Sequence, residues 1–193
     1  QPAAGDAGCA LGAAALLERP IHFTPYLGVN ATRQLTSQQY ADAILQGKIV
    51  AVIEGQAEFG PRALGNRSLL CLPTDDNIKK LNKIKNRAED SWRPYAPICQ
   101  KETADKWFHV TKACPYMLHI AKIKSGPFNT YDNSARLQVV SQDSNIFLWR
   151  ILELLRYSGH AVLINTSLNA KGKPIVNTVD DLKEIQLHNE LCY

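Results

Sequence analysis

The sequence predicts an α/β fold in which helices flank a twisted, mixed β-sheet. Two continuous apolar runs, residues 48–53 and 161–165, have the length and composition of strands buried on both faces. Two longer segments, residues 35–46 and 144–157, carry apolar residues at helical spacing. Because strands and helices alternate along the chain, we expect one sheet with helices packed on it.

The overall composition indicates a soluble, globular protein. The chain has 193 residues, of which 45% are hydrophobic and 21% charged, enough for one core or for one domain plus a fragment. No apolar run approaches the roughly 18 residues of a membrane span. The net charge is only +4, and such a small excess argues for a focused pocket rather than a broad nucleic-acid-binding face. Neither membrane nor nucleic acid is therefore an expected partner.

The cysteines and histidines indicate neither a disulfide framework nor a metal site. The five cysteines are odd in number and show no C-x-x-C spacing, which is typical of reduced thiols in a cytosolic protein. The five histidines are scattered, with no H-x-x-x-H pair. We therefore expect a cytoplasmic location and no metal-ligating residues.

The first part of the chain is predicted to contain two helices joined by a connector. Residues 2–17 combine a glycine turn with an Ala/Leu-rich stretch that favours a helix, although a flexible terminus fits as well. Two prolines break any helix in the connector at 18–33. Thr36 or Ser37 can cap the next helix, and Gly47 suits the left-handed position after its end.

A glycine-rich loop at 54–66 follows the first strand, and α/β proteins place ligands at strand ends. This loop matches neither a P-loop nor a dinucleotide-binding motif. We expect a strand at 68–72 after it, and then a helix over 78–84 capped by Asp75, Asp76 or Asn77.

The remaining elements continue the alternation. We expect a short helix, two strands, a helix and a strand at residues 101–110, 117–123, 136–140, 144–157 and 161–165. Asp143 or Ser144 should cap the long helix, whose predicted buried stripe is Leu148, Ile151, Leu152 and Leu155. A second polar loop occupies 166–174, and Thr178 with Asp181 predicts a capping box for the last helix.

Positive charge is concentrated between the first strand and Pro97. This stretch holds eight of the 22 Lys and Arg residues: Arg62, Arg67, Lys79, Lys80, Lys83, Lys85, Arg87 and Arg93. Apolar residues interleave with them, so the cations lie on a folded element, either as an organised phosphate or carboxylate site or as a solvated basic face. If the segment is extended, Lys85 and Arg87 project to the same side, as a clamp on a polyphosphate requires.

Five ordered blocks give the sequence a family resemblance: EFGPRALGNRS at 58–68, KIKNR with WRPYAP within 83–97, CPYM at 114–117, DNSARLQ at 132–138 and INTSLNAKGKPIV at 164–176. In order and spacing they resemble the C-terminal domain of the NodU-type O-carbamoyltransferase family. The resemblance implies that residues 25–193 form a YrdC-like domain, similar to threonylcarbamoyl-AMP synthase. It also implies that residues 1–20 are the remnant of a preceding ASKHA-type domain.

The YrdC-like hallmarks are a K-x-R pair and an S-x-N element, which match Lys85-Asn86-Arg87 and Ser167-Leu168-Asn169. In the family this domain makes carbamoyl-adenylate from ATP and carbamoyl phosphate, and the ASKHA-type domain passes the carbamoyl group to a substrate hydroxyl. The resemblance thus implies ATP with Mg²⁺, carbamoyl phosphate as co-substrate, and the ASKHA-type domain as partner. The fragment alone is not expected to complete transfer. Tyr131 and Cys114 depart from the family, which commonly has His and Ser there.

The site residues that this resemblance implies fall into two groups. Lys85, Arg87, Arg136 and Ser167 are expected to act on the reacting groups. The nucleotide and phosphates are expected to be held by Arg62, Gly65, Arg67, Ser68, Lys83, Arg93, Asn165 and Asn169.

Several of these assignments have structural alternatives. Arg62 and Arg67 could brace the loop through carbonyl groups, Asn165 could simply end a strand, and Arg136 could pair with Asp132. A non-catalytic module that binds a nucleotide or RNA is also compatible, because Trp92, Tyr95 and Trp107 could stack on bases. Threonylcarbamoyl-AMP synthase itself is the alternative enzyme.

Overall fold

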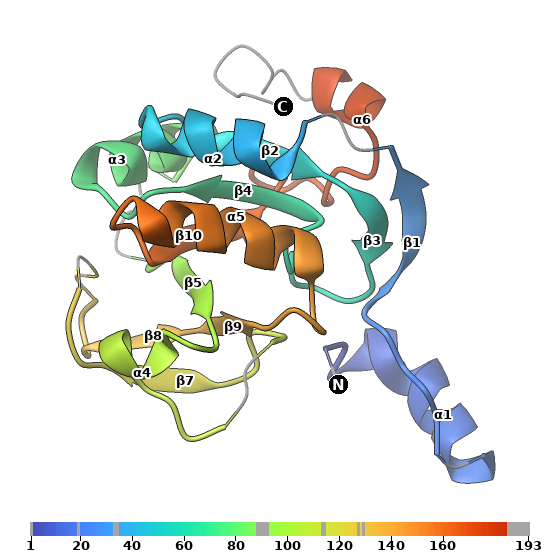
Figure 1. Cartoon of the computed structure of the whole chain (residues 1–193). Coiled ribbons are helices and arrows are strands. Elements are labelled where there is room, and N and C mark those ends of the chain that lie inside the picture. The colour runs from blue at the N-terminus through green and yellow to red at the C-terminus, as the bar shows by residue number, and fades with distance from the viewer. Residues whose placement is uncertain are drawn as a thin grey trace.

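A five-stranded mixed sheet forms the centre of the computed structural model, which describes residues 2–18, 20–32, 35–87, 93–112, 115–126, 128 and 130–184 (Figure 1). In spatial order its strands are β2 (Val50–Ile53), β4 (Arg67–Cys71), β10 (Val162–Ser167), β5 (Ala96–Gln100) and β9 (Gln138–Val140). Neighbours pair antiparallel except β5 and β9, which run parallel. The predicted α/β class with a mixed sheet is confirmed.

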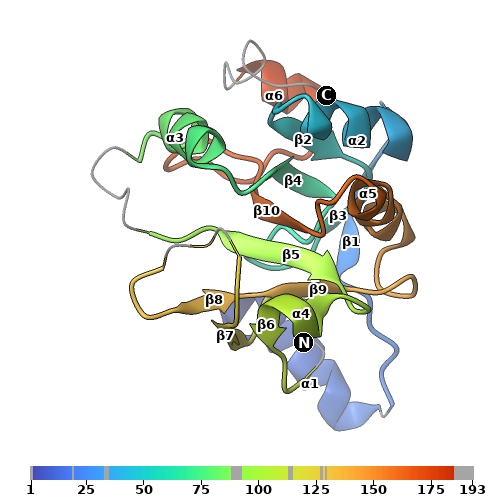
Figure 2. The same ribbon diagram turned by 60° about the vertical axis from the view of Figure 1, so that its left-hand side comes forward.

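Helices cover both faces of this sheet, as Figures 1 and 2 show together. On one face, α2 (Ser37–Leu45) and α5 (Ile146–Tyr157) pack over a single apolar core. The predicted stripe of α5 is buried there. On the other face, α3 (Asp75–Ile84) and α6 (Val179–Glu184) enclose a second core. The sheet is therefore buried on both sides, which explains the continuous apolar runs of β2 and β10.

The helix caps are partly those that the sequence predicts. Thr36 caps α2 in a capping box with Gln39, and the box of Thr178 and Asp181 at α6 is present. The caps predicted for α3 and α5 were wrong by one to three positions: Thr74 and Asn145 accept the first-turn N–H groups. The acidic residues proposed as caps of α3 instead occupy its first turn, where they complement the helix dipole.

Two small sheets lie at the edges, and most of their strands were not predicted. In one, β1 (Tyr26–Ala31) pairs antiparallel with β3 (Gly55–Glu58), so the connector at 18–33 and the loop at 54–66 each contain a strand. The other sheet consists of β6 (Phe108–His109), β7 (Ile120–Ile123) and β8 (Ser134–Arg136).

The prediction of one strand at 136–140 was wrong because Leu137 separates β8 from β9 in another sheet. The predicted helix at 101–110 is reduced to α4 (Ala104–Trp107). β5 was missed because it contains Pro97. That proline is tolerated because pairing with β9 starts one residue later, at Ile98.

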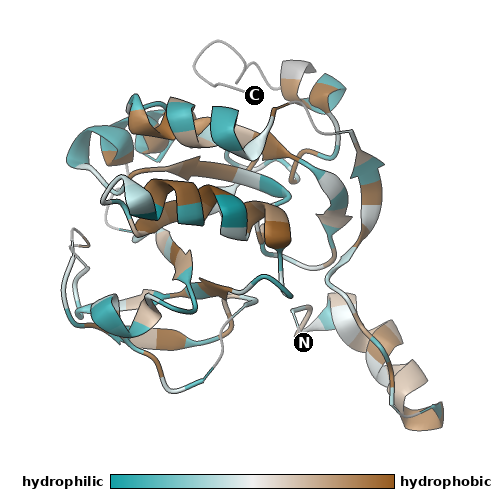
Figure 3. Cartoon of the chain, in the orientation of Figure 1, coloured by the Kyte–Doolittle hydropathy of each residue, from teal (hydrophilic) through white to brown (hydrophobic). Residues whose placement is uncertain are grey.

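The N-terminal helix α1 (Cys9–Leu17) projects from the rest of the chain (Figure 1) after a short 3₁₀ turn, η1 (Asp6–Gly8). It has no buried residue, and Leu16 and Leu17 are 77% and 89% exposed. Figure 3 shows that it is pale to brown along its length, without a consistently polar face. Just before it, Ala3 is buried against Gly60. No helix among the described residues is long and apolar enough to cross a membrane.

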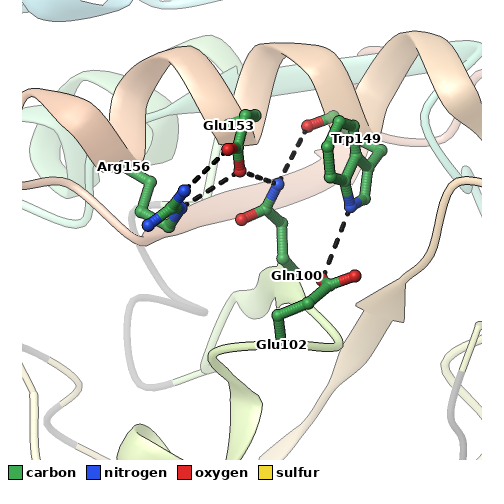
Figure 4. Close-up of polar contacts among 5 residues, drawn as sticks. All are labelled: Gln100, Glu102, Trp149, Glu153 and Arg156. Atoms are coloured by element: carbon green, nitrogen blue, oxygen red, sulfur yellow. Dashed lines mark hydrogen bonds and ion pairs between the residues drawn. The ribbon is translucent and has the colours of Figure 1, made fainter.

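A polar cluster joins the end of β5 to the outer side of α5 (Figure 4). The side chain of Gln100 donates to Glu153 Oε2 at 2.8 Å and to the carbonyl oxygen of Trp149 at 3.3 Å. Arg156 forms two hydrogen bonds to the same carboxylate, and together these interactions lower the pKa of Glu153 to about 2. This cluster fixes α5 over the sheet far from the polar loops described below.

Gly65 sets how closely the loop before β4 approaches α5. Its φ is +121°, and a Cβ there would lie 2.5 Å from Leu148 Cδ2. We expect Gly65→Ala to destabilise the fold by about 2–4 kcal/mol, from backbone strain plus overpacking. The measurement is urea unfolding followed by circular dichroism.

The matched control for this change is Gly159→Ala. Gly159 also has a positive φ, +87°, but a Cβ added there would meet no other atom within 4 Å. Only strain is introduced by this substitution, at a cost of about 1 kcal/mol. Equal losses in the two variants would contradict the close-packing argument.

Candidate functional site

Two polar loops at one end of the sheet bring the K-x-R and S-x-N motifs together. Lys85 and Arg87 follow α3, and Ser167 and Asn169 follow at the end of β10. With Arg93 and the backbone turn at 170–172, they line a cavity of roughly 200 Å³. Residues separated by about eighty positions in sequence therefore share one site.

Lys85 holds the S-x-N loop directly. Its ammonium group donates to the carbonyl oxygens of Ser167 and Asn169, and to Asn169 Oδ1 at 2.6 Å. Ser167 Oγ also bonds Asn169 Oδ1, at 2.7 Å. Lys85 is only 4% exposed, so this cation forms the floor of the cavity rather than its open wall.

The predicted extended clamp of Lys85 and Arg87 was wrong. Lys85 has right-handed helical geometry as the C-cap of α3, and Asn86 has a left-handed φ of 48°. This bend gives the two cations different surroundings. Arg87 stacks over the ring of Tyr95, with its guanidinium carbon 4.9 Å from the ring centroid.

The protonation of Lys85 is linked to this arrangement. Burial, and secondarily the charge of Arg87, lower the pKa of Lys85 to about 7. Three of its contacts are carbonyl-type oxygens that only accept hydrogen bonds, which requires three N–H donors and hence the ammonium form. A modest rise in pH therefore removes both a charge and a hydrogen bond from the site.

Two arginines, Arg87 and Arg93, line the cavity, and the charges of Arg62 and Arg136 act on the same region. Partial burial and the charges of Arg62, Arg93 and Arg87 lower the pKa of Arg136, which places the four groups within one electrostatic neighbourhood. Among the described residues, no carboxylate lies within ion-pair distance of any of them. Mutually repelling cations of this kind favour binding of a polyanion.

Arg67, by contrast, braces the structure. It is completely buried, and its five N–H groups are matched by five main-chain carbonyl oxygens. The acceptors lie 2.7–3.1 Å away on Val29, Glu54, Gly55, Asn66 and Asn177. The bracing alternative therefore describes Arg67 in this structure, and no N–H group remains for a phosphate.

Gly65 and Ser68, both expected to hold phosphates, are also occupied in shaping the loop. The Gly65 N–H donates to Ser68 Oγ at 3.0 Å, and Ser68 is fully buried.

Asn165 lies within β10 rather than at its end, and its amide donates to Gln138 Oε1 at 2.7 Å. Its Oδ1 is buried and has no hydrogen-bond partner among the described residues. Lys83 is exposed on α3 and does not line the cavity.

Asp132 accepts hydrogen bonds from the N–H and hydroxyl of Ser134, and not from Arg136. Tyr131 is fully exposed. Cys71 and Cys99 are buried and form no disulfide within the described part of the chain, while Trp92 and Cys114 lie outside the described residues. Within the described part of the chain, no group of three His, Cys, Asp or Glu side chains could hold a metal ion.

The sequence did not single out Glu58 or Lys171, and it indicated Tyr95 only as a ring that could stack on a base. Lys171 is exposed but lines the cavity. The ring of Tyr95 stacks against Arg87, and its hydroxyl donates to Asn82 at 2.8 Å. The spacing of aromatic and basic residues could have indicated this contact.

A second cavity of roughly 340 Å³ adjoins the first at Asn169 and gives room for a ligand larger than one phosphate group.

The fold and the site define an α/β domain with a cationic pocket suited to a polyanionic ligand. The family model described as carbamoyltransferase C-terminus matches residues 41–193, so the chain belongs to the carbamoyltransferase C-terminal family.

Curated relatives agree with this assignment. The nodulation protein NolO of Bradyrhizobium diazoefficiens is 32% identical over 94% of this chain and 40% of its own length. The 3'-hydroxymethylcephem-O-carbamoyltransferases of Amycolatopsis lactamdurans and Streptomyces clavuligerus are 37% and 39% identical, over 78% and 74% of this chain and 30% and 28% of theirs. The chain thus spans less than half the length of these relatives.

Solved structures support the architecture. Full-length HypF in its phosphate- and nucleotide-bound form aligns with a TM-score of 0.57 at 18% identity, over 80% of this chain and 20% of that one. HypF from T. kodakarensis gives a TM-score of 0.53 at 18% identity, over 78% and 19%. HypF has a YrdC-like domain, which agrees with the predicted YrdC-like fold.

We expect anion binding at this site to weaken as the pH rises above about 7. The free-site pKa of Lys85 is about 7, and a bound anion raises it. Binding above that pH must therefore take up a proton, whereas below it Lys85 is charged in both states. Sulfate, which does not titrate in this range, should lose several-fold in affinity between about pH 6.5 and about pH 8.5 by calorimetry.

Lys85→Met should bind sulfate more weakly and remove this pH dependence. Lys80→Met is the control, because Lys80 is an exposed helix residue paired with Asp76. A pH dependence unchanged in Lys85→Met would show that another group titrates.

Proposed function

We propose that this domain binds ATP and carbamoyl phosphate and forms carbamoyl-adenylate, for transfer to a hydroxyl of a small-molecule acceptor. The observation that carries the proposal is that Lys85, Arg87, Ser167 and Asn169 line one cavity, near arginines that form no ion pair with a carboxylate of the described residues. Membership of the carbamoyltransferase C-terminal family supports the type of group that is transferred.

The chemistry is a displacement at phosphorus. Water first hydrolyses carbamoyl phosphate, which breaks the bond between its carbamoyl and phosphate groups and releases carbamate and inorganic phosphate. A carbamate oxygen then forms a bond to the α-phosphorus of ATP. The bond from that phosphorus to the bridging oxygen breaks, and pyrophosphate leaves with the electron pair. Such a reaction needs positioning and neutralisation of growing negative charge more than covalent help from the protein.

The cavity offers cations suited to these tasks. Arg87 and Arg93 would neutralise the α-phosphate and the leaving pyrophosphate from the cavity wall, and Lys85 would do so from its floor. Arg62 and Arg136 would hold the carbamoyl phosphate end. Magnesium ion would enter with the triphosphate and add charge neutralisation there.

Ser167 would orient the reactants through hydrogen bonds, together with Asn169. Asn169 is fixed on its other side by donating to the carbonyl oxygen of Lys173 at 2.8 Å. The neighbouring cavity would take the remainder of the nucleotide. Preorganised donors of this kind stabilise a transition state without reorganising.

The transfer step would require a preceding ASKHA-type domain as partner. The exposed apolar surface of α1 supports this, since Leu16 and Leu17 find no partner within the described part of the chain. Residues 1–20 would then belong to the junction between the two domains. We place the reaction in the cytoplasm, where ATP is available and buried thiols such as Cys71 stay reduced.

The test of this function is ATP binding by calorimetry, followed by release of pyrophosphate that depends on carbamoyl phosphate. We expect Arg87→Ala to lose about 2–4 kcal/mol of transition-state stabilisation, because it removes a cation from the cavity wall. Arg156→Ala is the matched control: it also removes an arginine stacked on a tyrosine, 4.7 Å from the Tyr157 ring, but on the outer side of α5. It should leave both readouts unchanged.

Three outcomes would favour other functions. Binding of ATP without any pyrophosphate release would indicate a nucleotide-binding module. Release that depends on threonine and bicarbonate would indicate threonylcarbamoyl-AMP synthase. Absence of ATP binding by the folded protein would contradict a nucleotide site altogether.

A further inference from the structure

Glu58 is a buried carboxylate at the end of β3, directly before the loop that carries Arg62. One of its oxygens, Oε1, accepts three main-chain N–H groups: those of Leu64 at 2.6 Å, Asn66 at 2.7 Å and Arg67 at 3.2 Å. The other oxygen is buried and accepts no hydrogen bond from the described residues. The carboxylate thus forms its hydrogen bonds with the loop backbone, while its charge also acts on the buried guanidinium of Arg67.

Three converging amides on one oxygen fix the shape of the loop. Without the carboxylate, these N–H groups would point together into a buried site with nothing to accept them, which costs free energy for each one. These same hydrogen bonds stabilise the charged form of the carboxylate, which burial disfavours. Burial raises the pKa of Glu58, and the N–H groups of Asn66 and Leu64 oppose that rise.

The rest of the loop is anchored on either side of this interaction. The side chain of Asn66 donates to the carbonyl oxygen of Gln56 and accepts from Asn145 at the start of α5. Ala63 and Leu64 are buried. Arg62 is only half-buried, and its charge acts on Arg136. The loop therefore presents one cation to the arginine cluster while its other residues are held in place.

We propose that Glu58 is a positioning residue that holds Arg62 at the cationic site by organising the amides of Leu64, Asn66 and Arg67. Other atoms of Glu58 line the second cavity, but its carboxylate does not contact the ligand, because Oε1 is engaged by three amides and Oε2 is buried. This inference rests on the proposed function, because it takes the ligand to be a polyanion. It adds Glu58 to the residues that shape the site. An acidic side chain thereby supports the binding of an acidic ligand.

The experiment is a double-mutant cycle on ATP affinity, measured by calorimetry. Glu58→Ala should weaken ATP binding roughly tenfold when Arg62 is present, and by less than about twofold in the Arg62→Ala background, because its effect passes through Arg62. Glu58→Gln should keep most of the affinity, since its amide oxygen can accept the same three N–H groups. A general loss of structure would affect both backgrounds alike.

Two further variants keep the test informative. If Glu58→Ala does not fold, the same cycle is run with Glu58→Asp, whose shorter side chain keeps the charge but withdraws it from the amides. Glu153→Ala removes a carboxylate on the outer side of α5, near Gln100 (Figure 4), and should leave ATP affinity unchanged in both backgrounds.

The outcomes separate this inference from the proposed function. Equal losses of ATP affinity with and without Arg62 would overturn the positioning role. A Glu58→Gln variant as impaired as Glu58→Ala would overturn it too. In either case, ATP binding by the wild type would leave the proposed function standing. Wild-type affinity in Arg62→Ala would likewise overturn it, because there would be no effect of Arg62 to transmit. Failure of the folded wild type to bind ATP would instead overturn the function.

Discussion

The buried guanidinium of Arg67 is the constraint on which this end of the molecule depends. A buried charge is costly unless its hydrogen-bonding capacity is filled, and here five carbonyl oxygens fill it. Burial lowers the pKa of Arg67, and the charges of Glu58 and Glu54 oppose that shift. Because the five carbonyls come from β1, the start of β3, the loop before β4 and the approach to α6, one side chain fixes the relative positions of segments that are far apart in sequence.

This constraint separates two kinds of cation that look alike in sequence. Arg62 and Arg67 stand five residues apart in the same block, yet only Arg62 is left facing other cations. Arg67 is the first residue of β4, and strand pairing on both sides of β4 directs its side chain into the interior. The structural cation then fixes the loop that carries Arg62, whose charge acts on Arg136.

The sequence was sufficient wherever a local rule decides the structure. The apolar stripe of α5, the capping boxes and the buried inner strands follow from periodicity and side-chain chemistry. Pairings between distant segments have no such local rule. β1 and β3 have weak patterns and are paired edge strands, and β5 contains a proline that only its staggered pairing with β9 permits. Motif identity predicted that the K-x-R and S-x-N residues would meet. It did not predict that Gly65 and Ser68 would bond each other, and the bracing role of Arg67 was only an alternative.

The K-x-R motif shows why spacing alone misjudged the site. A spacing of two implies a two-pronged clamp only in an extended chain. Here Asn86 adopts a left-handed conformation at the end of α3, so Lys85 is turned into the S-x-N loop while Arg87 is supported by Tyr95 at the cavity wall. All three protons of Lys85 donate to that loop. Because Lys85 is buried, its charge would act strongly on a bound phosphate, both directly and through the groups that it orients. Deprotonation would thus weaken the attraction and release the S-x-N loop together, which couples the geometry of the site to its charge.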